Sequence, residues 1–204
     1  MVLKTLRGIV DSQFKGKKLG VAAIFFFLPS VLFILAQLLL GLQLNLGFLG
    51  TELLKQLVYL IAISIVLYIL LLAFKGKAVS GKFTSIICAY SVTYLITTVF
   101  VALIMLVIAL MVPGYFSAIS GLDTSDSLAI AQSVSALSLP EGLAQIAFFA
   151  IIGILGLFAV FASLYVVHRT GRLVKETGRF SNLVFLFVYA GLSVLVSTGI
   201  QMLF

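Results

Sequence analysis

Long uninterrupted apolar runs dominate the pattern of this chain. Five runs are long enough to cross the roughly 30 Å hydrocarbon core of a bilayer, which takes about 20 helical residues each. They cover residues 19–42, 53–74, 84–112, 142–167 and 182–204. The pattern therefore predicts an all-α integral membrane protein: a five-transmembrane-helix bundle in one membrane domain, residues 19–204, preceded by a flank over residues 1–18.

The N-terminal flank has a different pattern, in which apolar residues recur at helical spacing with charges between them. The apolar set is Val2, Leu3, Leu6, Ile9, Val10 and Phe14, and the charged set is Lys4, Arg7, Asp11 and Lys15. Such a pattern is typical of an amphipathic helix at a membrane interface. We therefore expect residues 1–18 to form a cytoplasmic, basic, amphipathic flank on the inner leaflet.

The longest connection, residues 113–139, also contains a helical pattern. Asp126 can cap a helix N-terminus. Apolar residues then recur at every third position, at Leu128, Ala131, Val134 and Leu137. A short helix resting on the outer surface is predicted there.

The charges are few and unevenly placed. Only 9% of residues are charged, and 13 Lys and Arg against 6 Asp and Glu give a net charge of +7. Lys55 is the one basic residue that does not lie before the first run, between the second and third, or between the fourth and fifth. Because cytoplasmic loops are enriched in Lys and Arg, we expect a cytoplasmic N-terminus and, after five crossings, an external C-terminus.

Composition excludes several classes of protein. A chain that is 63% hydrophobic, with a mean hydropathy of +1.31, is not water-soluble. Its basic excess follows the cytoplasmic face and does not indicate nucleic-acid binding. Within the apolar runs the only charge is Lys55, near the outer boundary, so no mid-membrane proton relay is available. Cys88 and His168 are the only residues of their types, and we expect no catalytic, metal or cofactor site.

Neutral polar and small residues leave alternatives open. Hydroxyls in the third and fifth runs, including Thr97 and Ser197, are able either to line a passage or to form hydrogen bonds between helices. Gly153 and Gly156 give the fourth run a small-residue stripe for close helix approach. One alternative is thus a homo-oligomeric channel or carrier for an ion or neutral solute. Another is an accessory subunit of a larger membrane complex.

The basic loops carry repeated short motifs. Phe14-Lys15-Gly16-Lys17 recurs as Phe74-Lys75-Gly76-Lys77, and Thr170-Gly171-Arg172 recurs as Thr177-Gly178-Arg179. Each Lys or Arg near an anionic membrane surface contributes about 1 kcal/mol of attraction. We therefore expect the inner face to bind anionic lipid head groups or an acidic partner. The candidate residues are Lys15, Lys17, Lys18, Lys75, Lys77, Lys82, Arg169, Arg172, Lys175 and Arg179.

The five predicted spans and the amphipathic flank are accompanied by the loop Ser80-Gly81-Lys82-Phe83-Thr84 and the following Ala89-Tyr90-Ser91. Together these features resemble the Ypt-interacting protein (Yip) family over most of the chain. Residues 167–172 look like the family's basic connection before its last helix. Val92-Thr93 replaces the proline that usually follows, and the eukaryotic Asp-Leu-Tyr-Gly-Pro signature is missing. The resemblance implies a divergent prokaryotic-type member in the plasma membrane. It further implies a membrane-organising or trafficking-like role without catalysis.

Overall fold

The structure is a computed structural model that describes residues 2–39, 46–112, 142–176 and 178–203. Within the 113–141 connection it also describes residues 114, 115, 118, 122, 126, 128, 129, 132 and 133. The elements of the described part are α1 (Val2–Gly16), α2 (Leu19–Leu39), α3 (Leu46–Lys75), the 3-10 turn η1 (Gly76–Val79), α4 (Phe83–Tyr90), α5 (Val92–Met111), α8 (Leu143–Val174) and α9 (Arg179–Leu203). The described part of the chain contains no strand, which confirms the all-α prediction.

Among the described residues, four helical stretches are long and apolar enough to cross a membrane. They are Leu53–Val79, Phe83–Met111, Leu143–Val174 and Ser181–Met202. The first predicted run coincides with α2, in which the apolar helical stretch is the shorter Leu19–Leu32. Pro29 lies inside α2, and residues 40–45 lie outside the described residues. The described part of the chain thus contains four candidate spanning helices and one shorter apolar helix, which is compatible with an integral membrane protein.

The third predicted run, 84–112, is not one continuous helix. It divides into α4 and α5, which meet at Ser91. The Ser91 hydroxyl donates to the carbonyl oxygen of Cys88 at 2.8 Å, and Thr93 Oγ1 donates to that of Tyr90 at 2.7 Å. Such side-chain bonds to the preceding turn bend helices, and they account for an interruption that hydropathy alone does not reveal.

The helix that contains the fourth predicted run, 142–167, extends beyond that run, because α8 continues to Val174. At 1.5 Å per residue, a helix of 32 residues is about 48 Å long, well over the thickness of the hydrocarbon core. The last turns stay helical because Val166, Thr170 and Val174 share a buried face. The basic segment 167–172, predicted as a connection, is therefore the rigid end of a helix.

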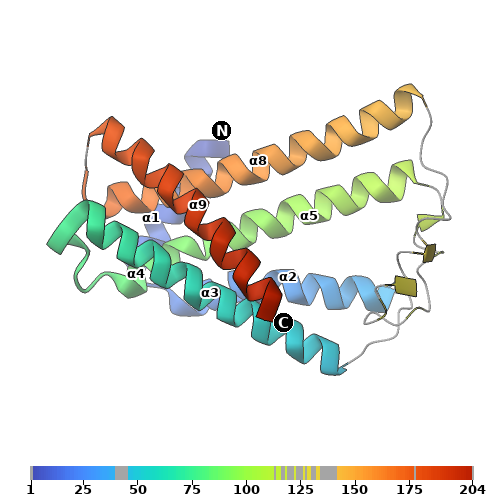
Figure 1. Cartoon of the computed structure of the whole chain (residues 1–204), viewed down its shortest axis with the longest axis horizontal. Helices are drawn as coiled ribbons and strands as arrows, with labels where there is room; N and C mark the ends of the chain where they lie inside the picture. The colour runs from blue at the N-terminus through green and yellow to red at the C-terminus, as the bar shows by residue number, and fades with distance from the viewer. Residues whose placement is uncertain are drawn as a thin grey trace.

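The helices pack in a definite order (Figure 1). The helix α5 lies beside α8 and α2, α3 lies beside α9, and α1 crosses one end of the bundle against α4 and α8. The buried core gathers at this same end. In α8, for example, Val166, Val167 and Val174 are buried, whereas Phe148 is the only buried residue from Leu143 to Tyr165.

The predicted amphipathic helix forms as α1. Its residues Leu6, Val10 and Phe14 enter the main hydrophobic core, and Leu3 remains exposed. The apolar face of α1 is therefore buried against protein, on α4 and α8, and is not left to the lipid interface alone. Its placement on the inner leaflet stays a prediction.

Candidate functional site

The segments that carry the candidate basic residues converge at one end of the bundle, where α3 and α8 end and α4 and α9 begin (Figure 1). We call this the basic end and define it by residues 14–19, 74–83 and 168–182. Polar contacts between residues far apart in the chain hold it together. The basic end is therefore a built part of the fold, and its side chains fall into two groups, those that hold helices together and those that face outward.

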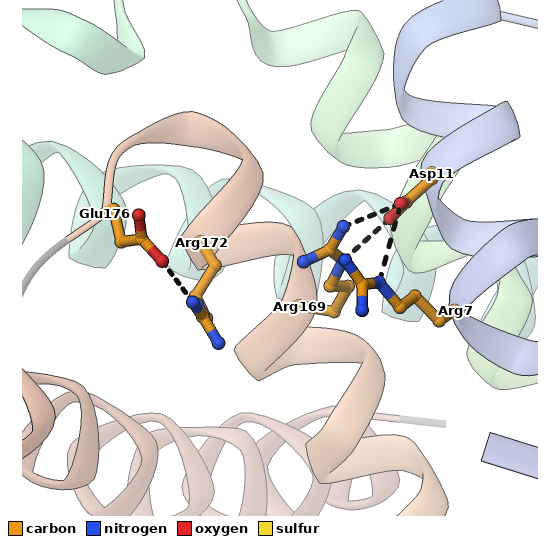
Figure 2. Close-up of polar contacts among 5 residues, drawn as sticks. All are labelled: Arg7, Asp11, Arg169, Arg172 and Glu176. Atoms are coloured by element: carbon orange, nitrogen blue, oxygen red, sulfur yellow. Dashed lines mark hydrogen bonds and ion pairs between the residues drawn. The ribbon is translucent and has the colours of Figure 1, made fainter. Parts of the chain in front are cut away.

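A bidentate ion pair attaches α1 to α8. Arg169 Nε donates to Asp11 Oδ1 at 2.7 Å, and Arg169 Nη2 lies 2.6 Å from Asp11 Oδ2. Arg7 Nε approaches the same carboxylate at 3.9 Å, and Figure 2 shows dashed lines from both arginines that converge on Asp11. The hydrogen bond from Arg169 holds the pKa of Asp11 below its usual value. Arg169 is thus chiefly the anchor of α1.

Two candidate lysines also make contacts inside the protein. Lys75 is only 3% exposed, and its Nζ donates to Asn182 Oδ1 at 2.8 Å, which joins the end of α3 to the start of α9. Lys82 Nζ donates to the carbonyl oxygen of Val174 at 3.1 Å. A cation suits this position because the last carbonyls of α8 lack helical partners and carry partial negative charge.

Arg172 lies on the exposed side of α8. It forms an ion pair with Glu176 just beyond the helix end (Figure 2). The hydrogen bond from Arg172 lowers the pKa of Glu176 below its usual value. Both side chains are accessible, so an incoming anion can compete with Glu176 for Arg172.

Five of the ten candidates are exposed lysines. We call them the basic rim: Lys15, Lys17, Lys18, Lys77 and Lys175. Arg179 begins α9, and its side chain lies outside the described residues. The nine candidates with described side chains thus divide into the basic rim, the accessible Arg172, and the helix-joining Lys75, Lys82 and Arg169.

A pocket of about 570 Å³ opens at the basic end between α8 and α9. His168 and Arg172 line it from α8, Asn182, Leu183 and Leu186 line it from α9, and Glu176 and Gly178 line it from the link between them. The sequence reasoning missed Asn182 because it opens an apolar run. Helical spacing could have indicated that Asn182 is buried, since it shares the buried face of α9 with Phe185 and Tyr189.

The hydroxyl rows of the third and fifth runs are engaged locally. Thr97 donates to the carbonyl oxygen of Thr93 at 3.0 Å, Thr98 to that of Tyr94 at 2.8 Å, and Ser193 to that of Ala190 at 2.9 Å. These hydroxyls thus donate their hydrogen bonds to carbonyl oxygens of their own helices. Ser197 differs, because it lines a pocket of about 210 Å³ between α3 and α9, together with Lys55 and Tyr59.

The small-residue stripe of α8, at Gly153 and Gly156, lies against no other helix in the described part of the chain. A Cβ added at Gly153 or Gly156 would meet no atom within 4 Å. A Cβ at Gly171 would meet Leu71 Cδ2 and Phe185 Cε1, both at 3.5 Å. Close helix approach therefore occurs at Gly171, at the basic end.

Asp126 caps a short helical turn in the 113–141 connection, as predicted: its Oδ1 accepts a hydrogen bond from the backbone N–H of Ala129 at 2.9 Å. Of the predicted apolar face, Leu128 is helical and exposed, and Ala131, Val134 and Leu137 lie outside the described residues. In the described part of the chain no group of three His, Cys, Asp or Glu could hold a metal ion. Cys88 is a buried free thiol.

No family model, curated protein or solved structure matches the chain. The resemblance to the Yip family therefore stays a prediction resting on the residues quoted for it.

Proposed function

We propose that this chain is a non-enzymatic integral membrane protein whose basic end binds the head groups of anionic lipids. The observation that carries the proposal is the division of the candidate residues. Lys75, Lys82 and Arg169 fix the helices, while the five lysines of the basic rim extend outward from that fixed frame. Exposed lysines on a rigid surface attract anionic lipid at about 1 kcal/mol each.

The proposal includes five membrane crossings, with α2 as the first, and a cytoplasmic basic end. The positive-inside rule supports this orientation, since 12 of the 13 basic residues would lie on the cytoplasmic side. The inner leaflet is also the one that carries anionic lipid. We place the protein in a prokaryotic plasma membrane, with a Yip-like role in membrane organisation.

Spin-labelled lipids test the proposal in proteoliposomes of phosphatidylcholine. Electron paramagnetic resonance measures the fraction of lipid that the protein immobilises. We expect a larger immobilised fraction for spin-labelled phosphatidylglycerol than for spin-labelled phosphatidylcholine. The difference should shrink with salt, because the Debye length falls from about 10 Å at 0.1 M to about 3 Å at 1 M.

A matched pair of variants assigns the effect to the basic rim. Changing Lys15, Lys17, Lys18, Lys77 and Lys175 together to Gln should remove most of the preference for phosphatidylglycerol. Changing the same five residues to Arg keeps their charge and should keep the preference. Equal immobilisation of the two lipids by the unmodified protein would refute the proposal.

An acidic protein partner is the second candidate ligand for the basic rim. A separate surface, the large apolar side chains exposed along α8, such as Leu157, Phe158 and Phe161, leaves room for a second copy of the chain or a larger membrane complex. Co-purification from native membranes separates these cases. A stoichiometric acidic subunit that the Gln variant fails to retain would replace lipid as the ligand.

A further inference from the structure

The pocket between α8 and α9 combines two kinds of surface. His168, Arg172 and Asn182 supply polar groups, and Leu183 and Leu186 continue along α9 as an apolar wall. The start of α9 also belongs to it through Gly178, whose carbonyl oxygen accepts from the backbone N–H of Asn182. The first turn of a long helix presents N–H groups and partial positive charge to a ligand.

The charges around this pocket are predominantly positive. Arg172, Lys75 and Arg169 all interact electrostatically with His168, and Lys175 interacts with Lys75. The carboxylates at the same place are Asp11, which pairs with Arg169, and Glu176, which pairs with Arg172. Among the described side chains, four cations therefore face two carboxylates, an excess that favours an anionic ligand.

His168 adds hydrogen-bonding capacity that the described residues do not use. Its Nδ1 is buried and has no hydrogen-bond partner among them. Buried polar atoms are normally paired, and those without a partner call for an explanation such as a ligand. His168 lines the pocket, and it is an imidazole whose hydrogen bonding is still incomplete.

We infer that this pocket binds the phosphate group of one anionic lipid, with an acyl chain along Leu183 and Leu186. The inference rests on the proposed function and deepens it, because it assigns one specific site within a surface that otherwise attracts many lipids. Arg172 is the direct phosphate ligand, since guanidinium groups match phosphate geometry with two parallel hydrogen bonds. His168 and the first turn of α9 complete the polar side.

Glu176 is the competitor in this arrangement. Its carboxylate occupies Arg172, and a lipid phosphate must displace it. Glu176 is exposed, so its displacement returns the carboxylate to water at small cost. Removing the charge of Glu176 should therefore tighten binding, a response opposite to that expected of a residue that holds the ligand.

His168 is the only histidine of the chain and provides a direct probe. Protein containing 15N-labelled histidine is placed in phosphatidylcholine nanodiscs, and the imidazole resonances are recorded by NMR. One series raises the mole fraction of phosphatidylglycerol, and a second adds inorganic phosphate. We expect a saturable shift of the His168 resonances with phosphatidylglycerol, at concentrations where inorganic phosphate produces little change.

Three variants assign the shift to the pocket. R172Q should weaken binding about tenfold or more, the loss expected for a charge-assisted hydrogen bond. E176Q should tighten it about two- to fivefold, in keeping with the modest strength of an exposed ion pair. K4Q removes one exposed positive charge on α1, outside both the pocket and the basic rim, and should change the affinity less than about twofold.

Each outcome supports or refutes the lipid site in this pocket. Saturation by inorganic phosphate as readily as by lipid would keep the phosphate site but assign it to a soluble anion. Absence of a saturable shift in both series, or equal losses in R172Q and K4Q, would overturn the site. If the spin-label preference persists in that case, the proposed function stands without the pocket. If the preference is also absent, both fail.

Discussion

The two halves of the helical bundle differ in how they use similar apolar sequence. Around the basic end, side chains from α1, α3, α4, α8 and α9 share one buried core. Along the half away from the basic end, most large apolar side chains of α8 are exposed to the surroundings. Hydropathy is high in both halves, so apolarity marks residues suited to a membrane, and packing against neighbours marks those that specify the fold.

The largest effect should come from a core aromatic residue at the basic end. Phe185 is 1% exposed and packs edge-to-face on Phe74, whereas Phe187, on the same helix, is 77% exposed. Phe185→Ala should lower the free energy of unfolding by about 3 kcal/mol, a usual loss for a buried phenylalanine. Phe187→Ala should change it by less than about 0.5 kcal/mol. Reversible unfolding in mixed micelles measures both, and equal losses would show that burial in the core at the basic end does not distinguish the two faces of α9.

A glycine pair tests the same contrast with smaller groups. At Gly171 the methyl groups of a valine would press on Leu71 and Phe185, whereas Gly156 has open space around it. Gly171→Val should therefore cost about 1–3 kcal/mol through overpacking. Gly156→Val should leave unfolding nearly unchanged. If Gly156→Val instead alters the oligomeric state by native mass spectrometry, the α8 stripe is an interface between copies.

The ion pair that attaches α1 should have an intermediate effect. Asp11→Asn should weaken the docking of α1 by about 1–2 kcal/mol, because it replaces a charged, bidentate partner of Arg169 that is only partly exposed. Arg7→Gln is the control, since Arg7 lies farther from the carboxylate and is more exposed. Protease cleavage within α1 should accelerate in the Asp11 variant and stay near its original rate in the Arg7 variant. Equal acceleration would show that the pair with Arg169 does not anchor α1.

The same ion pair predicts a pH dependence. Arg169 places the pKa of Asp11 below the usual 3.8 in the folded state. The contribution of Asp11 is therefore fully present above about pH 4 and is lost as the pH falls through the lowered pKa. Protease cleavage of α1 should thus stay slow at neutral pH and rise only in strong acid. The Asp11→Asn variant should not show this rise.

The smallest effect is expected at the hydroxyls of α5. Because Thr97 donates to the carbonyl oxygen of its own helix, Thr97→Val should change the free energy of unfolding by less than about 0.5 kcal/mol. Ion or solute flux through proteoliposomes should also stay the same. A flux that is present in the unmodified protein and lost in Thr97→Val would favour the channel alternative.

The repeated tetrapeptides show why loops were less predictable than helices. In Phe14-Lys15-Gly16-Lys17 the left-handed backbone falls at Lys17, with φ of 46°, and Lys15 is exposed. In Phe74-Lys75-Gly76-Lys77 it falls at Gly76, with φ of 62°, and Lys75 is buried. Identical residues therefore take different roles because neighbouring helices decide which side faces inward.

Helical spacing nevertheless predicts part of this difference between the two tetrapeptides. Lys75 follows Leu67 and Leu71 at intervals of four, which places it on the buried face of α3. The apolar runs and the N-terminal amphipathic pattern predicted the helices well for the same reason, since both depend on local periodicity. The ion pair between Asp11 and Arg169 joins residues 158 positions apart. No local pattern reveals such a contact.

Lipid retention tests the central claim most directly. The protein is released in the mass spectrometer from nanodiscs with equal amounts of phosphatidylglycerol and phosphatidylcholine, and the lipids that stay bound are counted. We predict that phosphatidylglycerol is retained in excess by the unmodified protein and by the variant with arginine at all five rim positions. In the glutamine variant most of that excess should be lost. Retention of both lipids in the ratio of the nanodisc, by all three proteins, would contradict a lipid-binding basic end.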